Sequence, residues 1–109
     1  MITREEFEDK LYNGKFNEEE LYNLRWFDLE MEESIYDDLK SINEEVDSDF
    51  DRWTAPASFI FSYKDDFFKL DYDKGLTELQ EDYFYYQPER VIKKTRMIEE
   101  VYWEPIKNE

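Results

Sequence analysis

The chain lacks cysteine and histidine altogether, and it contains only two glycines, Gly14 and Gly75. Zinc-thiolate centres, histidine-ligated metals, cysteine nucleophiles and histidine-based triads are therefore excluded. Two isolated glycines cannot form a glycine-rich phosphate-binding loop. Apolar runs are also short: Ala57–Phe61 is typical, and Ser58 interrupts it, so no segment is long enough to span a membrane. These absences argue against an enzyme. Because Met1–Glu6 also lacks the apolar stretch of a signal peptide, we expect an intracellular protein.

What the chain has in excess is negative charge and aromatic side chains. Its 109 residues include 30 Asp and Glu against 14 Lys and Arg, a net charge of −16, together with nine Phe, nine Tyr and three Trp. Disordered acidic tails have few aromatics, so residues 1–109 are predicted to form a single folded domain. Duplex DNA carries one charge per ~1.7 Å, so sixteen charges correspond to roughly 27 Å of duplex. A domain of this length is only about 30 Å across, so the two charge densities are comparable.

The negative charge is concentrated between Glu18 and Asp51. This segment holds fourteen carboxylates but only two cations, Arg25 and Lys40. Self-repulsion of this size destabilises a compact fold, and solubility alone needs much less charge. Two interpretations follow from charge alone: the carboxylates mimic the phosphates of a nucleic acid, or they form a highly charged surface kept for solubility.

Local patterns in the first half predict short helices. Thr3–Glu6 matches a capping box and predicts a helix over Arg4–Tyr12, and Asn17 begins a second short helix with acidic residues in its first turn. Alternating apolar residues predict a strand over Phe27–Glu32. Apolar residues at helical spacing predict a third helix over Ser34–Val46.

The second half alternates in the manner of strands. Ala57–Tyr63 and Phe68–Tyr72 predict a β-hairpin that ends near Gly75. Leu76–Tyr86 is predicted to be a connection, with one helical turn beginning at Thr77. Val91–Ile106 then forms one long strand or two short ones. The fold class predicted is α+β, with short N-terminal helices packed on an antiparallel sheet of about four strands.

Constellations that could carry chemistry are incomplete. Asp47–Asp51 has the spacing that opens a calcium-binding EF-hand loop, but Arg52 stands at the position that needs glycine, and Ser58 at the position that needs glutamate. Thirty acids always supply some pair at the separation that glycoside hydrolysis needs, but nothing marks one pair as buried. Proteins that bind single-stranded nucleic acids stack bases on aromatics inside a cationic groove, which this composition does not favour. We therefore predict no metal, no cofactor, no catalytic residue and no direct binding of nucleic acid.

Several short motifs lie between Arg52 and Trp103. They are Arg52-Trp53, Phe59-Ile60-Phe61, Phe68-Lys69-Leu70-Asp71-Tyr72, Gly75-Leu76-Thr77-Glu78-Leu79-Gln80-Glu81, Phe84, Gln87-Pro88, Val91 and Trp103. In these motifs the chain resembles a group of small acidic proteins of phages and prophages of Gram-positive bacteria. The genomic setting of that group resembles that of inhibitors of host defence, including anti-CRISPR and anti-restriction proteins. The resemblance covers roughly half of the chain and leaves the acidic N-terminal half outside it.

The resemblance and the charge together predict a non-enzymatic inhibitor of a bacterial nucleic-acid-targeting defence protein, acting in the host cytoplasm as an acidic nucleic-acid mimic. An RNA-guided nuclease is the leading partner, because its cationic channel holds a heteroduplex through backbone charge. The residues predicted to replace phosphates are Glu32, Glu33, Asp37, Asp38, Glu44, Glu45, Asp47, Asp49 and Asp51.

Two alternatives remain open on the sequence. The first is an immunity protein that neutralises a basic nuclease toxin through the same electrostatics. The second is a phage structural or assembly protein whose charge only keeps it soluble. The sequence determines neither the oligomeric state nor the identity of the target.

Overall fold

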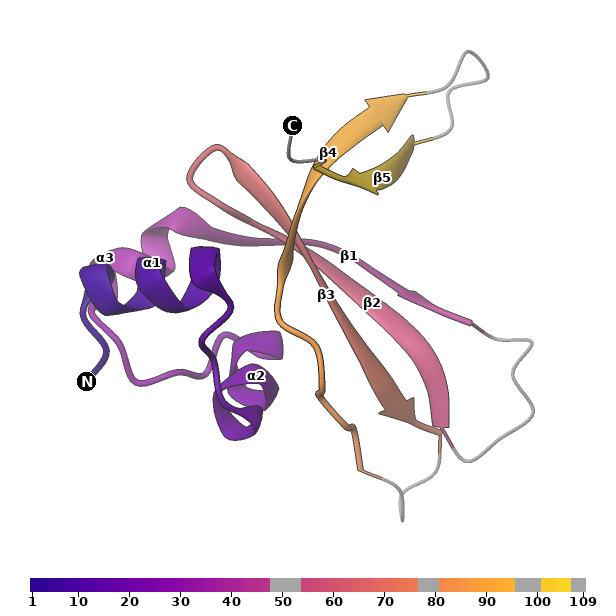
Figure 1. The fold of residues 1–109 in the computed structure, drawn as a ribbon, viewed down its shortest axis with the longest axis horizontal. Coiled ribbons are helices and arrows are strands. Elements are labelled where there is room, and N and C mark those ends of the chain that lie inside the picture. The colour runs from indigo at the N-terminus through magenta and orange to yellow at the C-terminus, as the bar shows by residue number, and fades with distance from the viewer. Residues whose placement is uncertain (48–53, 77–80, 96–100, 107–109) are drawn as a thin grey trace.

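The computed structural model describes residues 1–47, 54–76, 81–95 and 101–106, which form three helices and a five-stranded antiparallel sheet (Figure 1). The helices are α1 (Arg4–Asn13), α2 (Glu18–Arg25) and α3 (Glu33–Asp38). The strands are β1 (Leu39–Val46), β2 (Thr54–Tyr63), β3 (Asp66–Gly75), β4 (Glu89–Thr95) and β5 (Val101–Pro105), in the sheet order β1-β2-β3-β4-β5. The α+β class is confirmed. The fifth strand arises because the C-terminal alternating segment forms two short strands.

The first two helices form for the predicted local reasons. The Thr3 side chain accepts a hydrogen bond from the Glu6 amide, and Gly14 ends α1 with φ +65°, in the left-handed region. Asn17 and Glu20 form a reciprocal capping box at the start of α2. These caps satisfy backbone groups that a helix end would otherwise leave unpaired. Capping therefore sets where both helices begin.

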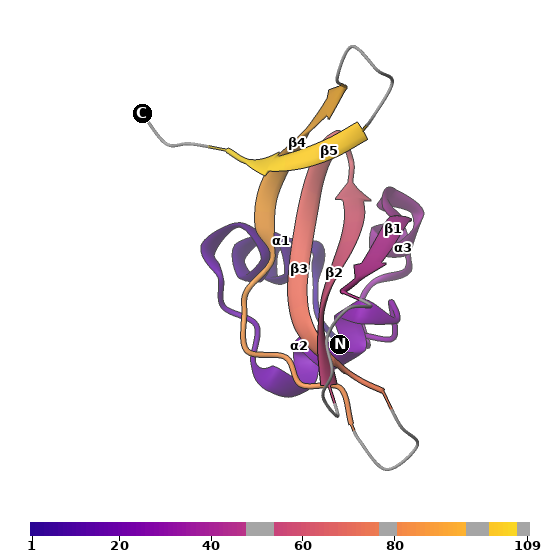
Figure 2. The ribbon, with the colours of Figure 1, turned by 90° about the vertical axis from the view of Figure 1, so that its right-hand side faces the viewer.

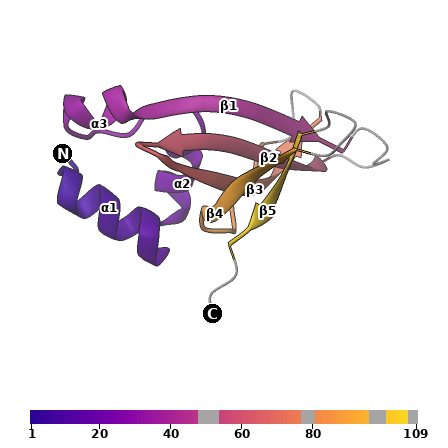
Figure 3. The same cartoon turned by 90° about the horizontal axis from the view of Figure 1, so that it is seen from above.

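The main core lies between the helices and one face of the sheet. The hairpin β2–β3 pairs in continuous register from Thr54–Gly75 to Tyr63–Asp66, so alternate side chains of both strands face the helices. Figure 3 shows α1 and α2 together on one side of the sheet. The buried cluster consists of Phe7, Leu11, Phe16, Leu21, Leu24, Leu29, Met31, Ile35, Leu39, Ala57, Phe59, Phe61, Tyr63, Phe68, Leu70, Tyr72 and Phe84. Most of the phenylalanines are thus core residues.

A second, smaller apolar contact lies on the other face of the sheet. In Figure 2, β5 crosses in front of β3, on the side away from the helices. Trp103 of β5 contacts Phe67 of β3, with ring centroids 5.0 Å apart. Val91 pairs with Phe67 in the sheet register and is 2% exposed. The β4–β5 hairpin therefore covers part of the sheet face that the helices leave open.

The predicted strand over Phe27–Glu32 is wrong as a strand, although its alternation is real. Leu29 and Met31 are buried and Asp28 and Glu30 are exposed, but the only β-bridge in this part of the described chain joins Ile2 to Met31. The segment is an extended connection that lies on the core without a neighbouring strand. Burial of alternate side chains does not by itself require a ladder of hydrogen bonds.

The predicted helix over Ser34–Val46 is wrong in its second half. α3 ends at Asp38, and Leu39 has extended backbone angles (φ −98°, ψ 131°). From Leu39 onward the chain pairs with β2, with a bulge between Ser41 and Asn43 that leaves Ile42 exposed. Pairing satisfies the outer backbone groups of β2, a tertiary gain that outweighs the local helical spacing. The helical turn predicted from Thr77 lies outside the described residues.

The Gln87 side chain links the connection before β4 to the turn between α1 and α2 through two hydrogen bonds. The Gln87 amide donates from Nε2 to the Phe16 carbonyl (2.8 Å), and its Oε1 accepts from the Phe16 amide (3.0 Å). A Cβ at Gly14 would lie only 3.2 Å from Cγ of Gln87. Gln87 thus pairs like a strand residue with the turn between α1 and α2.

We expect Gln87→Ala to lower the free energy of unfolding by about 1–3 kcal/mol, because both Phe16 backbone groups lose their partner in a half-buried place. Urea denaturation measures the change. Asn43→Ala, which removes one exposed contact to Glu45, serves as the control and should stay within about 0.5 kcal/mol of the parent. Equal midpoints for the two variants would contradict this role of Gln87.

Candidate functional site

Arg25, at the end of α2, binds one carboxylate of the acidic segment inside the molecule. Its guanidinium lies 2.7 Å from Glu44 of β1 and donates from Nε to the Tyr72 hydroxyl (3.2 Å). It also stacks on aromatic rings, 4.4 Å from the centroid of Trp26 and 4.3 Å from that of Phe59. Such planar stacking suits arginine rather than lysine. Glu44 is therefore part of the fold and not a free surface charge.

The carboxylate of Glu44 gathers further donors. It accepts hydrogen bonds from the Tyr72 hydroxyl and from Lys74 Nζ (3.2 Å). Burial alone would raise the pKa of Glu44, but these hydrogen bonds and the charge of Arg25 outweigh it and lower the pKa below its usual value. The same site raises the pKa of Tyr72 to about 12, through burial and then its bond to Glu44.

Arg4 forms an ion pair with Asp38, as Arg25 does with Glu44. Its guanidinium lies 2.8 Å from the Asp38 carboxylate at the end of α3 and donates to the Ser34 carbonyl (2.7 Å). It also donates to the Tyr63 hydroxyl (2.7 Å), which in turn donates to Glu8. These bonds join α1, α3 and β2. Of the nine predicted phosphate surrogates, Asp38 and Glu44 are thus neutralised within the chain.

The other predicted residues in the described part of the chain face outward along one margin of the sheet. We define the acidic edge as Glu32, Glu33, Asp37, Glu45 and Asp47, carried by α3, β1 and the residues that flank them. Figure 1 shows α3 continuing directly into β1, which is the first strand of the sheet. Four of these side chains are exposed and Glu32 is half-buried. Asp49 and Asp51 lie outside the described residues.

The local fold determines this outward display. Glu33 and Asp37 are four residues apart on α3 and therefore share a helix face. On β1, Glu45 pairs with Ser58, on the sheet face away from the main core. The bulge between Ser41 and Asn43 shifts the alternation, so that Glu44 turns toward Arg25 and Glu45 turns away. The inserted residue thus determines that Glu44, and not Glu45, pairs with Arg25.

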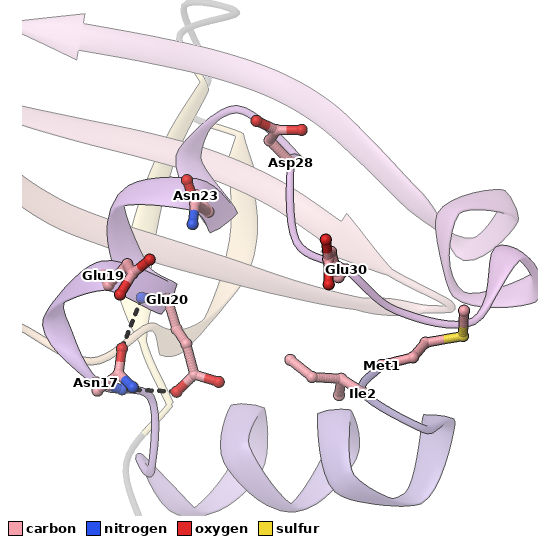
Figure 4. A pocket seen from close by; sticks show the side chains of 8 residues that line it. All are labelled: Met1, Ile2, Asn17, Glu19, Glu20, Asn23, Asp28 and Glu30. Atoms are coloured by element: carbon pink, nitrogen blue, oxygen red, sulfur yellow. Dashed lines mark hydrogen bonds between the residues drawn. The ribbon is translucent and has the colours of Figure 1, made fainter.

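A pocket extends the acidic surface beyond the predicted residues. It measures about 600 Å³ and lies between the start of α2, the connection to α3 and the first residues of the chain (Figure 4). Exposed Glu19, Asp28 and Glu30 surround it, and Glu20, also at its wall, pairs with Lys10 at 3.1 Å. These acids belong to the acidic segment from Glu18 to Asp51, but they are not among the nine residues predicted to replace phosphates. Acidic and apolar residues alternate over residues 28–31, and this pattern predicts that Asp28 and Glu30 lie on the same side of the chain.

Phe27 explains why Asp28 and Glu30 reach this pocket. It has φ +51°, in the left-handed region that reverses the chain after α2, and its ring packs on Phe59 and Phe61. The Asp28 amide then donates to the Asn23 carbonyl (2.8 Å), which closes the helix end. The chain leaves α2 with its apolar side chains inward and its carboxylates outward.

Within residues 1–47, 54–76, 81–95 and 101–106, no group of three or more acidic side chains is arranged to hold a metal ion. The described helices include none that is both long and apolar enough to cross a membrane. The exposed carboxylates of this surface can bind cationic groups.

Comparisons with protein-family models, with curated proteins and with solved structures found no match to this chain.

We expect Glu44→Gln to destabilise the protein at neutral pH and to lose this effect in acid. A carboxylate whose pKa is lowered by folding stabilises the native state above its unfolded value of 4.5, and that contribution disappears as the pH falls through the lowered pKa. Urea denaturation between pH 7 and pH 3 should show the parent and variant converging.

Glu45→Gln is the matched control, because it removes the same charge from the next residue of β1, where the side chain is exposed. It should leave a small difference throughout the pH range. A difference for Glu44→Gln that is constant from pH 7 to pH 3 would contradict the assignment of Glu44 to an internal ion pair.

Proposed function

We propose that the chain is a non-enzymatic inhibitor that binds a bacterial nucleic-acid-targeting defence protein, presenting carboxylates in place of phosphates. The observation that carries this proposal is an uncompensated set of carboxylates between α2 and the end of β1. Eight of them make no ion pair with a described residue: Glu18, Glu19, Asp28, Glu30, Glu32, Glu33, Asp37 and Glu45. In the same segment Arg25 is bound by Glu44, so Lys40 is left to offset them.

The display of these carboxylates is fixed by the fold. On a helix, residues four apart, such as Glu33 and Asp37, have Cβ atoms about 5–6 Å apart. Residues on one side of a strand recur about every 6.6 Å. Each phosphate of one DNA strand occupies about 3.4 Å of helix axis, so the carboxylates and the phosphates are spaced on the same scale of a few ångströms. A preformed anionic surface of this kind loses little conformational entropy on binding a preformed cationic channel.

An RNA-guided nuclease remains the leading target. Such an enzyme holds its heteroduplex through backbone charge and reads a short DNA motif with arginines. Carboxylates that occupy either place would block target binding without chemistry, and long-range attraction would accelerate the encounter. The inhibitor would then act in the cytoplasm of the bacterial host.

Charge reversal on the acidic edge tests this proposal. We expect Glu33→Lys, Asp37→Lys and Glu45→Lys together to weaken inhibition at least a hundredfold, because attraction becomes repulsion at three contacts. The measurement is binding of a target duplex by purified, guide-loaded RNA-guided nucleases from Gram-positive bacteria, with and without the protein. The parent chain should prevent duplex binding by at least one of them.

The matched control reverses three exposed carboxylates elsewhere, Glu5, Asp65 and Glu89, and changes the net charge by the same amount. This variant should retain inhibition to within about tenfold, since only screened long-range attraction is lost. Equal losses in the two variants would show that net charge alone acts, and no effect on any nuclease tested would refute the choice of target.

A further inference from the structure

A cluster of exposed tyrosines lies on α2 and on the connection between β3 and β4, which carry no residue of the acidic edge. We define the tyrosine patch as Tyr22 of α2 together with Tyr83, Tyr85 and Tyr86 of the connection between β3 and β4. Their exposed fractions are 47%, 39%, 58% and 60%. The rings of Tyr83 and Tyr85 are nearly parallel with centroids 6.3 Å apart, and Tyr86 meets Tyr85 edge-on at 6.2 Å. Four large side chains in one place form an exposed aromatic surface of the kind that marks interfaces.

The patch is held firmly against the core. Phe84, between the exposed tyrosines in the sequence, is 2% exposed and stacks on Tyr72 at 4.7 Å. Tyr22 packs edge-on against the same Phe84 ring at 5.7 Å. Backbone hydrogen bonds in both directions join Tyr83 to Asp73 of β3. The tyrosines therefore project from an ordered base rather than from a free loop.

Carboxylates surround the patch. A pocket of about 370 Å³ between α2 and the connection is lined by Glu18, Glu19, Tyr22, Glu81, Asp82, Tyr83 and Phe84. Neither lysine nor arginine is among these lining residues. Asp82 caps the Gly75 amide (2.9 Å), whereas Glu18, Glu19 and Glu81 are exposed and make no ion pair with a described residue. Desolvation raises the pKa of Tyr85, and the negative charges of Asp73 and Glu18 raise it further.

We propose that the tyrosine patch binds arginine or lysine side chains from a basic segment of a partner protein. A cation over a tyrosine ring is attracted by the ring's electron density, and nearby carboxylates add direct ion pairs. The chain already contains this combination internally: the Arg25 guanidinium lies against the rings of Trp26 and Phe59 and is bound by Glu44. The tyrosine patch offers the same two elements, rings and carboxylates, and no cation is among the described residues that line its pocket.

Charge selects this occupant over the others. A nucleic acid would be repelled by the carboxylates around the pocket. A second copy of the chain brings a net charge of −16, and at least eight of its 14 cations are engaged in ion pairs between described residues of their own chain. A basic protein segment is the partner whose charge and shape complement the patch.

This inference goes beyond the proposed function. Glu18 and Glu19 belong to both sets of carboxylates, but the tyrosine rings and Glu81 form a contact surface that contains no residue of the acidic edge. The two surfaces differ in physical character. Ion pairs along an exposed edge weaken strongly with salt, whereas cations seated on aromatic rings keep part of their affinity. A partner that uses both surfaces would show a salt-resistant fraction of binding that comes from the tyrosine patch.

The test is an NMR titration of the full-length, ¹⁵N-labelled protein at physiological ionic strength. The probe is a capped seven-residue peptide of alternating arginine and glycine. We expect saturable shifts concentrated at residues 18–22 and 81–86. Tyr85→Leu should weaken binding about fivefold, whereas Tyr85→Phe, which keeps the ring, should bind within about twofold of the parent. Because Tyr85 is exposed, unchanged shifts of core amides should verify that both variants are folded.

The variant with Glu33→Lys, Asp37→Lys and Glu45→Lys separates this inference from the proposed function. It should keep the peptide shifts at residues 18–22 and 81–86 even though it loses inhibition. Two results would overturn the inference: shifts spread along the acidic edge with none concentrated at the tyrosine patch, or equal affinities of Tyr85→Leu and Tyr85→Phe. Neither result depends on whether any nuclease is inhibited.

Discussion

The ion pair between Arg25 and Glu44 joins the helices to the acidic margin of the sheet. One guanidinium, seated on the rings of Trp26 and Phe59, reaches from the end of α2 to the outer strand β1. The chain has 14 cations for 30 carboxylates, so each cation that is bound within the fold is unavailable to the carboxylates on the surface. The two arginines of the helical half stabilise the fold in this way, and what remains outside is a strongly anionic surface. The same arrangement that makes the fold possible therefore creates the candidate binding surface.

Much of the fold follows from local patterns. Caps at Thr3 and Asn17 predict α1 and α2, and the alternation of the central hairpin predicts β2 and β3. Local patterns fail where the outcome depends on a distant partner. Residues 39–46 have helical spacing, but β2 needs a neighbour along its outer side, and pairing with it makes this segment a strand. Periodicity describes which side chains are buried; it does not reveal which backbone groups are left to be satisfied.

The candidate site was predictable as a segment but not residue by residue. Charge counting identifies the acidic stretch, and most of its carboxylates are indeed exposed. It cannot tell that Asp38 and Glu44 are bound by arginines more than fifteen residues away in sequence, because that pairing depends on tertiary contacts. Nor does it reveal that a bulge in β1 separates the roles of two adjacent glutamates. Asp28 and Glu30 join Glu19 and Glu20 around the pocket of Figure 4 after the chain reverses at Phe27, a tertiary arrangement that charge counting does not show.

The most direct test of the mimicry mechanism is the salt dependence of binding between this protein and an inhibited nuclease. Ion pairs between the carboxylates and the cationic channel release counterions from both surfaces and are screened by salt, so the logarithm of the association constant should fall steeply with the logarithm of salt concentration. Calorimetry or surface plasmon resonance between about 50 and 300 mM salt measures that slope. Phosphate mimicry predicts a steep negative slope and mutually exclusive binding of the protein and the target duplex. A flat slope, or a ternary complex in which the duplex stays bound, would contradict it.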